Sequence, residues 1–392
     1  MANLFKKYKK KLHLFISFLR FYYRDSKMIK GVDNFFFFPF YHVGGAERVH
    51  ADIVKALADQ KNCVFFTGSS VNDFFYKEFE GENTILLDIS GILSKKKYIG
   101  LTRKKIIELI NGSSRAYVFG CNSLFFYETI PFLKDHVICM DLVHAFVHKN
   151  EIGAEHWSLP IADRLTKRVF ISKKAMEDLK EQYRENNIEK DLLNRAVYIP
   201  NKVLIPEVLN KTNRTSKLQA IYVGRGSEEK RVHLVGAIAK KCIQDLHLNI
   251  EFTFVGDVKN AVPQEYHPFI NFYGEIKDQE IMNKIYRASD MVLITSSREG
   301  FPMAIMEGMA FGVIPVSTNV GDISSHVRTN ETGFLIDNYS DENSIVNDFA
   351  RTIKELSLDE SKRLKLSQKA YEYAKENFNP EKFTSAYRNL FK

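Results

Sequence analysis

Cysteine and tryptophan are scarce in this chain, which has four cysteines and one tryptophan among 392 residues. The cysteines lie far apart and form no C-x-x-C pair (Cys63, Cys121, Cys139 and Cys242). This spacing supports neither a zinc site nor a disulfide framework. We therefore expect four buried, unpaired thiols in a protein of a reducing compartment.

Several catalytic signatures are also missing from the sequence. It contains no P-loop of the form G-x-x-x-x-G-K-[ST], no G-x-S-x-G elbow and no H-E-x-x-H. It contains no D-x-D pair either, so a divalent metal held by close aspartates has no obvious site. We expect neither a bound metal nor a cofactor.

The net positive charge of the chain comes from one short segment. The chain has a formal net charge of +8, and residues 1–30 contain nine Lys or Arg and one Asp. The rest of the chain has 47 basic and 47 acidic residues and is formally neutral. Because a neutral body argues against a broad nucleic-acid surface, we expect no nucleic acid among the partners.

The basic segment at residues 1–30 predicts an amphipathic helix. Its apolar stretch is too short and too charged to span a bilayer, and no small-residue cleavage site follows it. Apolar residues recur there with helical spacing (Leu4, Tyr8, Leu12, Phe15, Ile16, Leu19, Tyr22 and Tyr23). Such a helix can lie on an anionic lipid surface, or it can pack its stripe on the first domain. The pattern is compatible with both.

From residue 31 onward, short apolar runs alternate with amphipathic stretches. Seven runs in the first half predict strands: Asn34–Phe40, Cys63–Thr67, Thr84–Ile89, Ala116–Phe119, Val137–Met140, Val169–Ile171 and Ala196–Ile199. After a polar linker at Asn201–Lys217, five more follow: Leu218–Val223, Ile250–Val255, Ile270–Tyr273, Met291–Ile294 and Val313–Val316. Helices are expected at Ala46–Asp59, at Thr102–Ile110, from Ser172, and over Asp359–Lys392 with a break at Asn379–Pro380.

This alternation defines the expected fold class. Strands that alternate with helices predict parallel sheets covered on both faces. The sequence therefore predicts an α/β protein with two doubly wound domains, at residues 31–200 and 201–379.

The most informative segment is S-S-R-E-G-F-P-M-A-I-M-E-G-M-A-F-G at 296–312. It follows a predicted strand and opens a helix, for which Pro302 is a good first position. Free amides around Phe301 and Met303 would point into the crevice at the carboxyl end of the strand. A helix N-terminus of this kind favours phosphate or sugar hydroxyls.

Two carboxylates accompany this helix. Glu299 precedes it and Glu307 lies more than one turn inside it. Carboxylates accept hydrogen bonds from vicinal hydroxyls, so a hexose and a ribose are plausible partners. The alternative is that Glu299 caps the helix and Glu307 is a solvated helix residue.

A second segment, I-Y-V-G-R-G-S-E-E-K at 221–230, runs from a strand into a glycine turn. Arg225 offers a planar fork and Lys230 a point charge, and one diphosphate can use both. The alternative is a surface loop in which Glu228 or Glu229 pairs with Lys230.

Two further features lie in the first half. Gly44 and Gly45, in H-V-G-G-A-E-R at 42–48, permit a close backbone approach to a ligand or tight packing of a helix. His144 follows a predicted strand and could donate to a sugar hydroxyl or move protons. A buried core histidine is the alternative for His144, and His148 is a competing candidate.

Taken together, these segments resemble the retaining glycosyltransferases of family 4, also called group 1, whose mark is two glutamates separated by seven residues. The similar stretches are G-G-A-E-R at 44–48, I-P-N at 199–201, V-G-R with a lysine at 223–230, F-V-G-D at 254–257 and a nearly continuous one at 272–336. The resemblance implies the GT-B architecture, in which two Rossmann-like domains face each other across a cleft. It also implies a donor-binding second domain and a closing helix, at 380–392, that returns to the acceptor-side first domain.

The resemblance implies roles for residues of the second half. Glu299 would contact hydroxyls of the donor sugar, and Glu307 would bind the ribose. Arg225 and Lys230 would hold the diphosphate and stabilise its departure. The backbone that would touch sugar and diphosphate is that of Gly300, Phe301, Pro302 and Met303.

In the first half, the resemblance implies that Gly44 and Gly45 let their loop approach the phosphates or the acceptor. His144 is similar to the family's active-site histidine near the donor sugar. The chain also departs from the family pattern: Arg231 replaces a glycine, G-D-I-S-S at 321–325 replaces paired glycines and a later acidic residue, and Gly308 replaces a common alanine.

The expected function follows from these residues and the resemblance. The chain is predicted to be a retaining hexosyltransferase that uses a UDP- or GDP-linked sugar and front-face displacement, with the leaving diphosphate helping to take the acceptor proton. The acceptor is expected to be a carbohydrate or a lipid-linked precursor of surface polysaccharide. A cytoplasmic protein, peripheral on the inner membrane face through residues 1–30, is expected. The alternatives are a nucleotide-sugar epimerase of the same architecture and a non-catalytic nucleotide-sugar-binding partner at the membrane.

Overall fold

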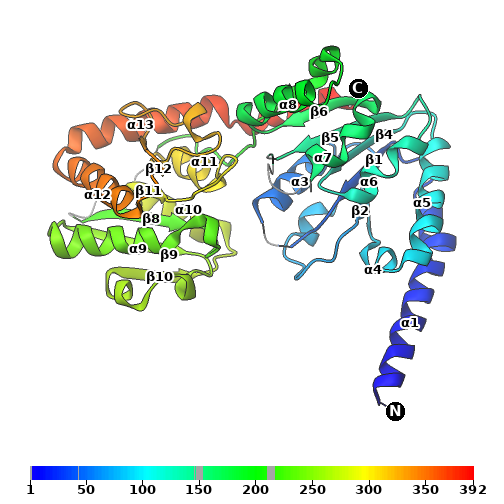
Figure 1. The fold of residues 1–392 in the computed structure, drawn as a ribbon, viewed down its shortest axis with the longest axis horizontal. Helices are drawn as coiled ribbons and strands as arrows, with labels where there is room; N and C mark the ends of the chain where they lie inside the picture. Colours follow the sequence, from blue (N-terminus) through cyan, green and yellow to red (C-terminus); the bar gives the residue numbers. More distant parts are fainter. Residues whose placement is uncertain (1, 43, 145, 147–152, 210–216) are drawn as a thin grey trace. The chain divides into compact units, whose positions relative to one another are not determined.

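The structure, a computed structural model, describes residues 2–42, 44–144, 146, 153–209 and 217–392 (Figure 1). The chain forms two compact units. The first comprises Met1–Ile199 together with Phe383–Lys392, and the second comprises Pro200–Lys382. Each unit has its own parallel sheet and its own apolar core.

The first unit is built on a seven-stranded sheet in the order β3-β2-β1-β4-β5-β6-β7, with every neighbouring pair parallel. Its strands are β1 (Asn34–Phe38), β2 (Asn62–Phe66), β3 (Thr84–Asp88), β4 (Tyr117–Cys121), β5 (Ile138–Val143), β6 (Leu165–Phe170) and β7 (Ala196–Tyr198). The α-helices of the unit are α1 (Ala2–Arg20), α2 (Ser26–Met28), α3 (Gly45–Ala56), α4 (Ser90–Leu93), α5 (Lys96–Asn111), α6 (Leu124–Tyr127), α7 (Ala154–Trp157), α8 (Lys173–Glu185) and α14 (Pro380–Leu390) from Phe383 onward.

The phenylalanine run of β1 explains why this sheet is covered on both faces. All five residues of Asn34–Phe38 are buried. Because successive side chains of a strand alternate, Phe35 and Phe37 enter one core cluster while Phe36 and Phe38 enter another. The second cluster also contains Phe383, Tyr387 and Phe391, so the end of the chain packs on the first sheet.

The second unit is built on a six-stranded parallel sheet in the order β10-β9-β8-β11-β12-β13. Its strands are β8 (Leu218–Val223), β9 (Ile250–Val255), β10 (Ile270–Gly274), β11 (Met291–Ile294), β12 (Ile314–Thr318) and β13 (Phe334–Ile336). Its α-helices are α9 (Val232–Lys240), α10 (Gln279–Ala288), α11 (Met303–Ala310), α12 (Glu342–Leu358) and α13 (Glu360–Asn377).

Both sheets confirm the predicted α/β class with two doubly wound units. In each sheet the strand order reverses once, between β1 and β4 in the first and between β8 and β11 in the second. Ligands of open α/β sheets bind outside the carboxyl ends of the strands at such a reversal. The four cysteines are buried and free, as expected.

The predicted apolar stripe of the N-terminal helix is wrong in part. Phe18 and Phe21 are buried in the first unit, with Phe18 stacked on Tyr98 at 4.7 Å between ring centroids, and Leu14, Leu19 and Tyr22 pack against the same core, so Leu19 and Tyr22 of the predicted stripe do face the unit. Leu12, Phe15 and Ile16 are 60%, 45% and 55% exposed. The helix is therefore apolar on two sides, and a single stripe could not describe it. No helix in the described ranges combines the length and the apolarity that a membrane crossing requires.

Candidate functional site

The loops that follow β8 and β11 carry most of the predicted site residues. These strands are hydrogen-bonded neighbours at the reversal of the second sheet. The loop after β8 contains Arg225 and Lys230, and the loop after β11 contains Glu299. The topology thus brings Lys230 and Glu299, which are 69 residues apart in sequence, to one edge of the sheet.

At this edge Lys230 and Glu299 form an ion pair. The Lys230 Nζ donates to Glu299 Oε1 at 2.6 Å, and the Ser296 hydroxyl is 2.6 Å from the same oxygen. The Glu299 side chain is 8% exposed and that of Lys230 is 22% exposed. Within the described residues, Glu299 Oε2 makes no hydrogen bond, so one carboxylate oxygen remains available to a ligand.

The two loops are fastened to each other next to this pair. Arg231 donates from its guanidinium to the backbone oxygens of Thr295 and Ser296, at 2.8 and 3.1 Å. In return the Thr295 hydroxyl donates to the Arg231 carbonyl at 2.9 Å, and the Ser297 amide donates to the Glu229 carbonyl at 2.8 Å. These bonds fix the position of Lys230 beside Glu299.

This arrangement explains the departure at Arg231. Its φ of 44° lies in the left-handed region, which glycine adopts without cost and other residues rarely adopt. An arginine there accepts some backbone strain, and its guanidinium hydrogen bonds offset it. The predicted alternative, in which Glu228 or Glu229 pairs with Lys230, is wrong. Glu229 instead accepts from the Ser227 hydroxyl at 2.7 Å, a bond that lowers its pKa.

Helix α11 opens one residue later than predicted. Pro302 has a ψ of 128°, so it is the extended residue that precedes the helix and not its first helical residue. The first amides of a helix have no intrahelical acceptor, and those of Met303 and Ala304 find no acceptor among the described residues. Further along the helix, Glu307 accepts from the Tyr286 hydroxyl of α10 at 2.8 Å.

The unusual segment at 321–325 supports the Glu299 loop. The Asp322 amide donates to the Gly300 carbonyl at 2.9 Å. A Cβ at Gly321, where φ is +60°, would lie 2.0 Å from the Glu299 carbonyl oxygen. Only glycine fits there, because the position needs both a left-handed backbone and empty space.

Arg225 is the exposed member of the predicted set. Its backbone carbonyl accepts from the Tyr222 hydroxyl at 2.9 Å, which orders the turn, while its side chain lies in solvent. The Arg225 guanidinium therefore lies on the same loop as Lys230 but makes no contact with the Lys230–Glu299 pair.

The glycine pair of the first unit opens helix α3. A Cβ at Gly44 would lie 2.0 Å from Glu47 Oε2, the flexible end of a side chain that folds back over the helix start, so a larger residue there would displace this carboxylate. Gly45 is the first helical residue and is exposed. Gly44 thus packs against the Glu47 side chain, and Gly45 exposes its backbone to solvent.

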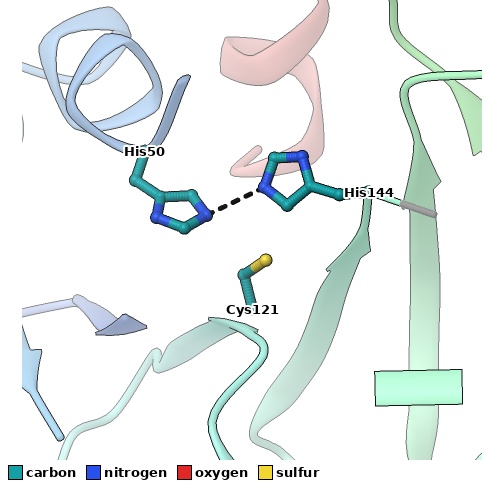
Figure 2. Close-up of side chains that lie close together, drawn as sticks. All are labelled: His50, Cys121 and His144. Atoms are coloured by element: carbon teal, nitrogen blue, oxygen red, sulfur yellow. Dashed lines mark hydrogen bonds between the residues drawn. The ribbon is translucent and has the colours of Figure 1, made fainter. Parts of the chain in front are cut away.

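His144, which follows β5, lies against two residues that the sequence analysis did not connect with it. Its Nε2 is 3.0 Å from Nε2 of His50, on α3, and the Cys121 thiol at the end of β4 lies beside both rings (Figure 2). Sequence reasoning treated Cys121 as a core thiol and did not weigh His50. Cys121 ends β4 and His144 follows β5, on neighbouring strands, but His50 lies inside α3, so no strand-end signal pointed to it.

This cluster is uncharged. Burial lowers the pKa of His144 to about 4, and burial with the neighbouring His144 lowers that of His50 well below its usual value. Burial, Asp141 and Glu47 raise the pKa of the Cys121 thiol. The competing candidate His148 lies outside the described residues.

Comparison of the sequence with protein families gives a match at residues 206–373 to the family described as glycosyl transferases group 1. An uncharacterized glycosyltransferase of Methanocaldococcus jannaschii is 25% identical over 369 residues, which cover 89% of this chain and 95% of that protein. The N-acetyl-alpha-D-glucosaminyl L-malate synthase of Bacillus anthracis is 23% identical over 58% of this chain and 51% of its own length.

Solved structures show the same fold at low sequence identity. The pneumococcal O-GlcNAc transferase GtfA, in complex with UDP and GlcNAc, superposes with a TM-score of 0.72 at 12% identity, covering 92% of this chain and 99% of that one. HepE of Anabaena, in complex with UDP and glucose, gives a TM-score of 0.68 at 15% identity, covering 91% and 98%. Residues 206–373 thus belong to the glycosyl transferases of group 1, and the chain that carries them is a glycosyltransferase with the GT-B fold.

Proposed function

We propose that this protein is a retaining glycosyltransferase that moves a sugar from a UDP- or GDP-linked donor to a carbohydrate acceptor. The observation that carries the proposal is the Lys230–Glu299 pair at the reversal of the second sheet, beside the unbonded amides that open α11. A cation and helix-end amides suit a diphosphate, and a carboxylate suits sugar hydroxyls.

Lys230 and Glu299 can each form further hydrogen bonds, Lys230 to the diphosphate of such a donor and Glu299 to its sugar. An ammonium group has three hydrogens, and Lys230 gives one of them to Glu299, so the others are available to diphosphate oxygens. Glu299 accepts both of its bonds on Oε1, so Oε2 is available to a sugar hydroxyl. Arg225 lies in solvent on the same loop and would add a second cation when a diphosphate is bound.

Glu307 is assigned to the ribose. Its Oε2 is held by Tyr286, which orients the carboxylate at a fixed place on α11. Two carboxylates, Glu299 before the helix and held by a lysine and Glu307 within it and held by a tyrosine, would thus bind the sugar and the ribose of one nucleotide-sugar. The neighbours crystallised with UDP and a sugar favour UDP as the first nucleotide to test.

The proposed chemistry is front-face displacement. The bond from the anomeric carbon to the diphosphate breaks, and a bond from the acceptor oxygen to that carbon forms on the same face. The acceptor proton moves to the leaving diphosphate oxygen, while Lys230 and Arg225 stabilise the negative charge that develops there. Neither a metal nor a covalent intermediate enters this proposal.

The test is a transfer assay of the full chain with UDP- and GDP-linked sugars and glycan acceptors, in which nucleotide diphosphate release and the anomeric form of the product are measured. We expect diphosphate release that depends on the acceptor and a product with the anomeric configuration of the donor. An inverted product would refute the retaining assignment. Isomerised donor without acceptor would indicate an epimerase, and binding without turnover a non-catalytic partner.

We also propose that the acceptor is lipid-linked and that the protein meets it at the cytoplasmic face of a membrane. The support is the second apolar side of α1, where Leu12, Phe15 and Ile16 are exposed near the exposed Lys9 and Lys11. Exposed apolar residues next to lysines suit the interface of an anionic bilayer.

Deleting residues 1–30 is a poor test of this membrane role, because Phe18, Phe21 and Ile29 belong to the core of the first unit. The sharper variant changes Leu12, Phe15 and Ile16 to Ser. Its matched control changes three apolar residues exposed elsewhere on the first unit, Leu101, Leu124 and Phe132, to Ser. The first variant should lose sedimentation with phosphatidylglycerol vesicles and the control should keep it. Equal sedimentation of both refutes the membrane role.

A further inference from the structure

The contact between His50 and His144 bears on the tautomer of His144, the residue that the family resemblance places near the donor sugar. His50 lies on α3 and is fully buried, and its ring stacks on Phe38 at 4.3 Å between centroids with 6° between planes. The stacking and the helix fix this ring. Its Nε2 meets Nε2 of His144 at 3.0 Å, a normal hydrogen-bond distance.

The geometry of the contact is that of a straight hydrogen bond. The two ring centroids are 5.2 Å apart and the two nitrogens 3.0 Å apart. The difference nearly equals two imidazole radii, so both nitrogens lie close to the line that joins the ring centres. A metal held by both Nε2 atoms and the Cys121 sulfur would need the rings bent toward a common point about 2 Å from each nitrogen. The straight alignment favours a shared proton over a shared ion.

The free nitrogens decide which ring donates. His50 Nδ1 is buried and has no hydrogen-bond partner among the described residues. If His144 donated, His50 would have to carry its own hydrogen on Nδ1, and a buried N–H without an acceptor is costly. If His50 donates from Nε2, its Nδ1 is an unprotonated nitrogen that leaves no buried N–H unpaired. The second arrangement is the more stable one.

The remaining hydrogen of His144 then has one place. With Nε2 accepting from His50, the neutral ring carries its hydrogen on Nδ1. That nitrogen points away from His50 and Cys121 in Figure 2, and it is not among the buried atoms without a partner. His144 therefore presents an N–H outward from the cluster.

We propose that His50 is a positioning residue that locks His144 as the neutral Nδ1–H tautomer. Within the proposed transfer reaction, on which this inference rests, His144 then acts as a hydrogen-bond donor to a substrate hydroxyl and does not act as a base. The surrounding groups agree, since the Cys121 thiol and the Tyr387 phenol both have a raised pKa through burial and stay neutral. The carboxylates of Asp141 and Glu47 add to the raised pKa of the thiol.

The direct test is nitrogen-15 NMR of the full chain labelled at histidine, with the His144 signals assigned by their loss in His144→Asn. We expect His144 Nδ1 to be of the protonated type and Nε2 of the unprotonated type in the absence of any ligand. This readout does not need transfer activity, so it fails or holds independently of the proposed function. A His144 protonated at Nε2 overturns the inference, as does one equivalent of bound zinc that is lost in Cys121→Ser and kept in Cys139→Ser.

Two variants separate positioning from folding. His50→Gln retains a side-chain N–H that can donate to His144, whereas His50→Leu removes the donor. We expect His50→Leu to lower kcat on the order of tenfold with little change in KM, and His50→Gln to restore most of it, since one hydrogen bond is involved. His50→Leu should also show mixed His144 tautomers. If both variants keep the wild-type tautomer and wild-type kcat, His50 does not position His144.

Discussion

The two units of this protein place different chemistry at the same position of the same topology. Each has a parallel sheet whose strand order reverses once, and each gathers side chains at the carboxyl ends of the strands beside that reversal. The first unit gathers two neutral imidazoles and a thiol. The second gathers an ion pair next to unbonded helix amides.

The difference shows what the fold decides and what the side chains decide. The topology brings distant loops together in both units. In the second unit, the Lys230 ammonium and the Glu299 carboxylate can form further hydrogen bonds, which suits a charged ligand with many hydroxyls. In the first unit, burial removes charge, so the cluster can offer a directed hydrogen bond but no net charge.

The largest loss of activity is expected when the cation of the second unit is removed. Lys230→Ala should lower transfer turnover by on the order of 100-fold or more, because the leaving diphosphate loses a group that stabilises its charge. The measurement is the rate of nucleotide diphosphate release at saturating donor. Lys240→Ala is the matched control, since Lys240 pairs with Glu265 on the surface of the same unit. Equal rates for both variants would contradict the role of Lys230.

A second change tests the support of the Glu299 loop. Gly321→Ala should destabilise the second unit by on the order of 2 kcal/mol and reduce transfer, because the added Cβ would strain the backbone and displace the Glu299 carbonyl. Gly274→Ala is the control, since its φ is also positive, at +68°, but no atom lies within 4 Å of the added Cβ. Urea unfolding of both variants measures the difference. A Gly274→Ala effect as large as that of Gly321→Ala would mean that strain alone, without the loop contact, explains the loss.

The smallest expected effect concerns the neutral cluster and pH. The pKa of His144 is about 4 in the folded state and near 6.5 when exposed, so the unfolded chain binds more protons between these values. Folding stability should therefore fall as the pH decreases from about 6.5 to about 4, by on the order of 1 kcal/mol from this partly exposed residue. The check is urea unfolding of wild type and His144→Asn across this range. His144→Asn should flatten the slope, and His136→Asn, at an exposed histidine, should not; identical slopes in all three proteins contradict the burial of a neutral His144.

Much of the fold was accessible from the sequence, because strands buried on both faces are continuous apolar runs. The strands β8, β9 and β11 begin and end where the sequence predicted. The strand β13 was missed, since three residues, Phe334–Ile336, are too short a run to distinguish from a loop. Helix α5 begins at Lys96, six residues before its predicted start.

The sequence predicted which loops carry the residues of the candidate site, but not which side chains contact each other there. The loop after each strand followed from topology, so Lys230 and Glu299 were correctly placed at one edge. Which carboxylate pairs with Lys230 depends on the fastening of the loops by Arg231, a residue that entered only as a departure from a pattern. The partnership of His144 with His50 depends on the register of α3 against β5, which no local pattern contains.

The proposed function requires that the second unit bind a nucleotide diphosphate through Lys230. Its most direct test is isothermal titration of UDP and of GDP into the wild type, Lys230→Ala and Lys240→Ala. We expect one of the two nucleotides to bind the wild type and Lys240→Ala with equal affinity and to bind Lys230→Ala at least about tenfold more weakly. Equal affinity for all three proteins, or no binding of either nucleotide to the wild type, would contradict it.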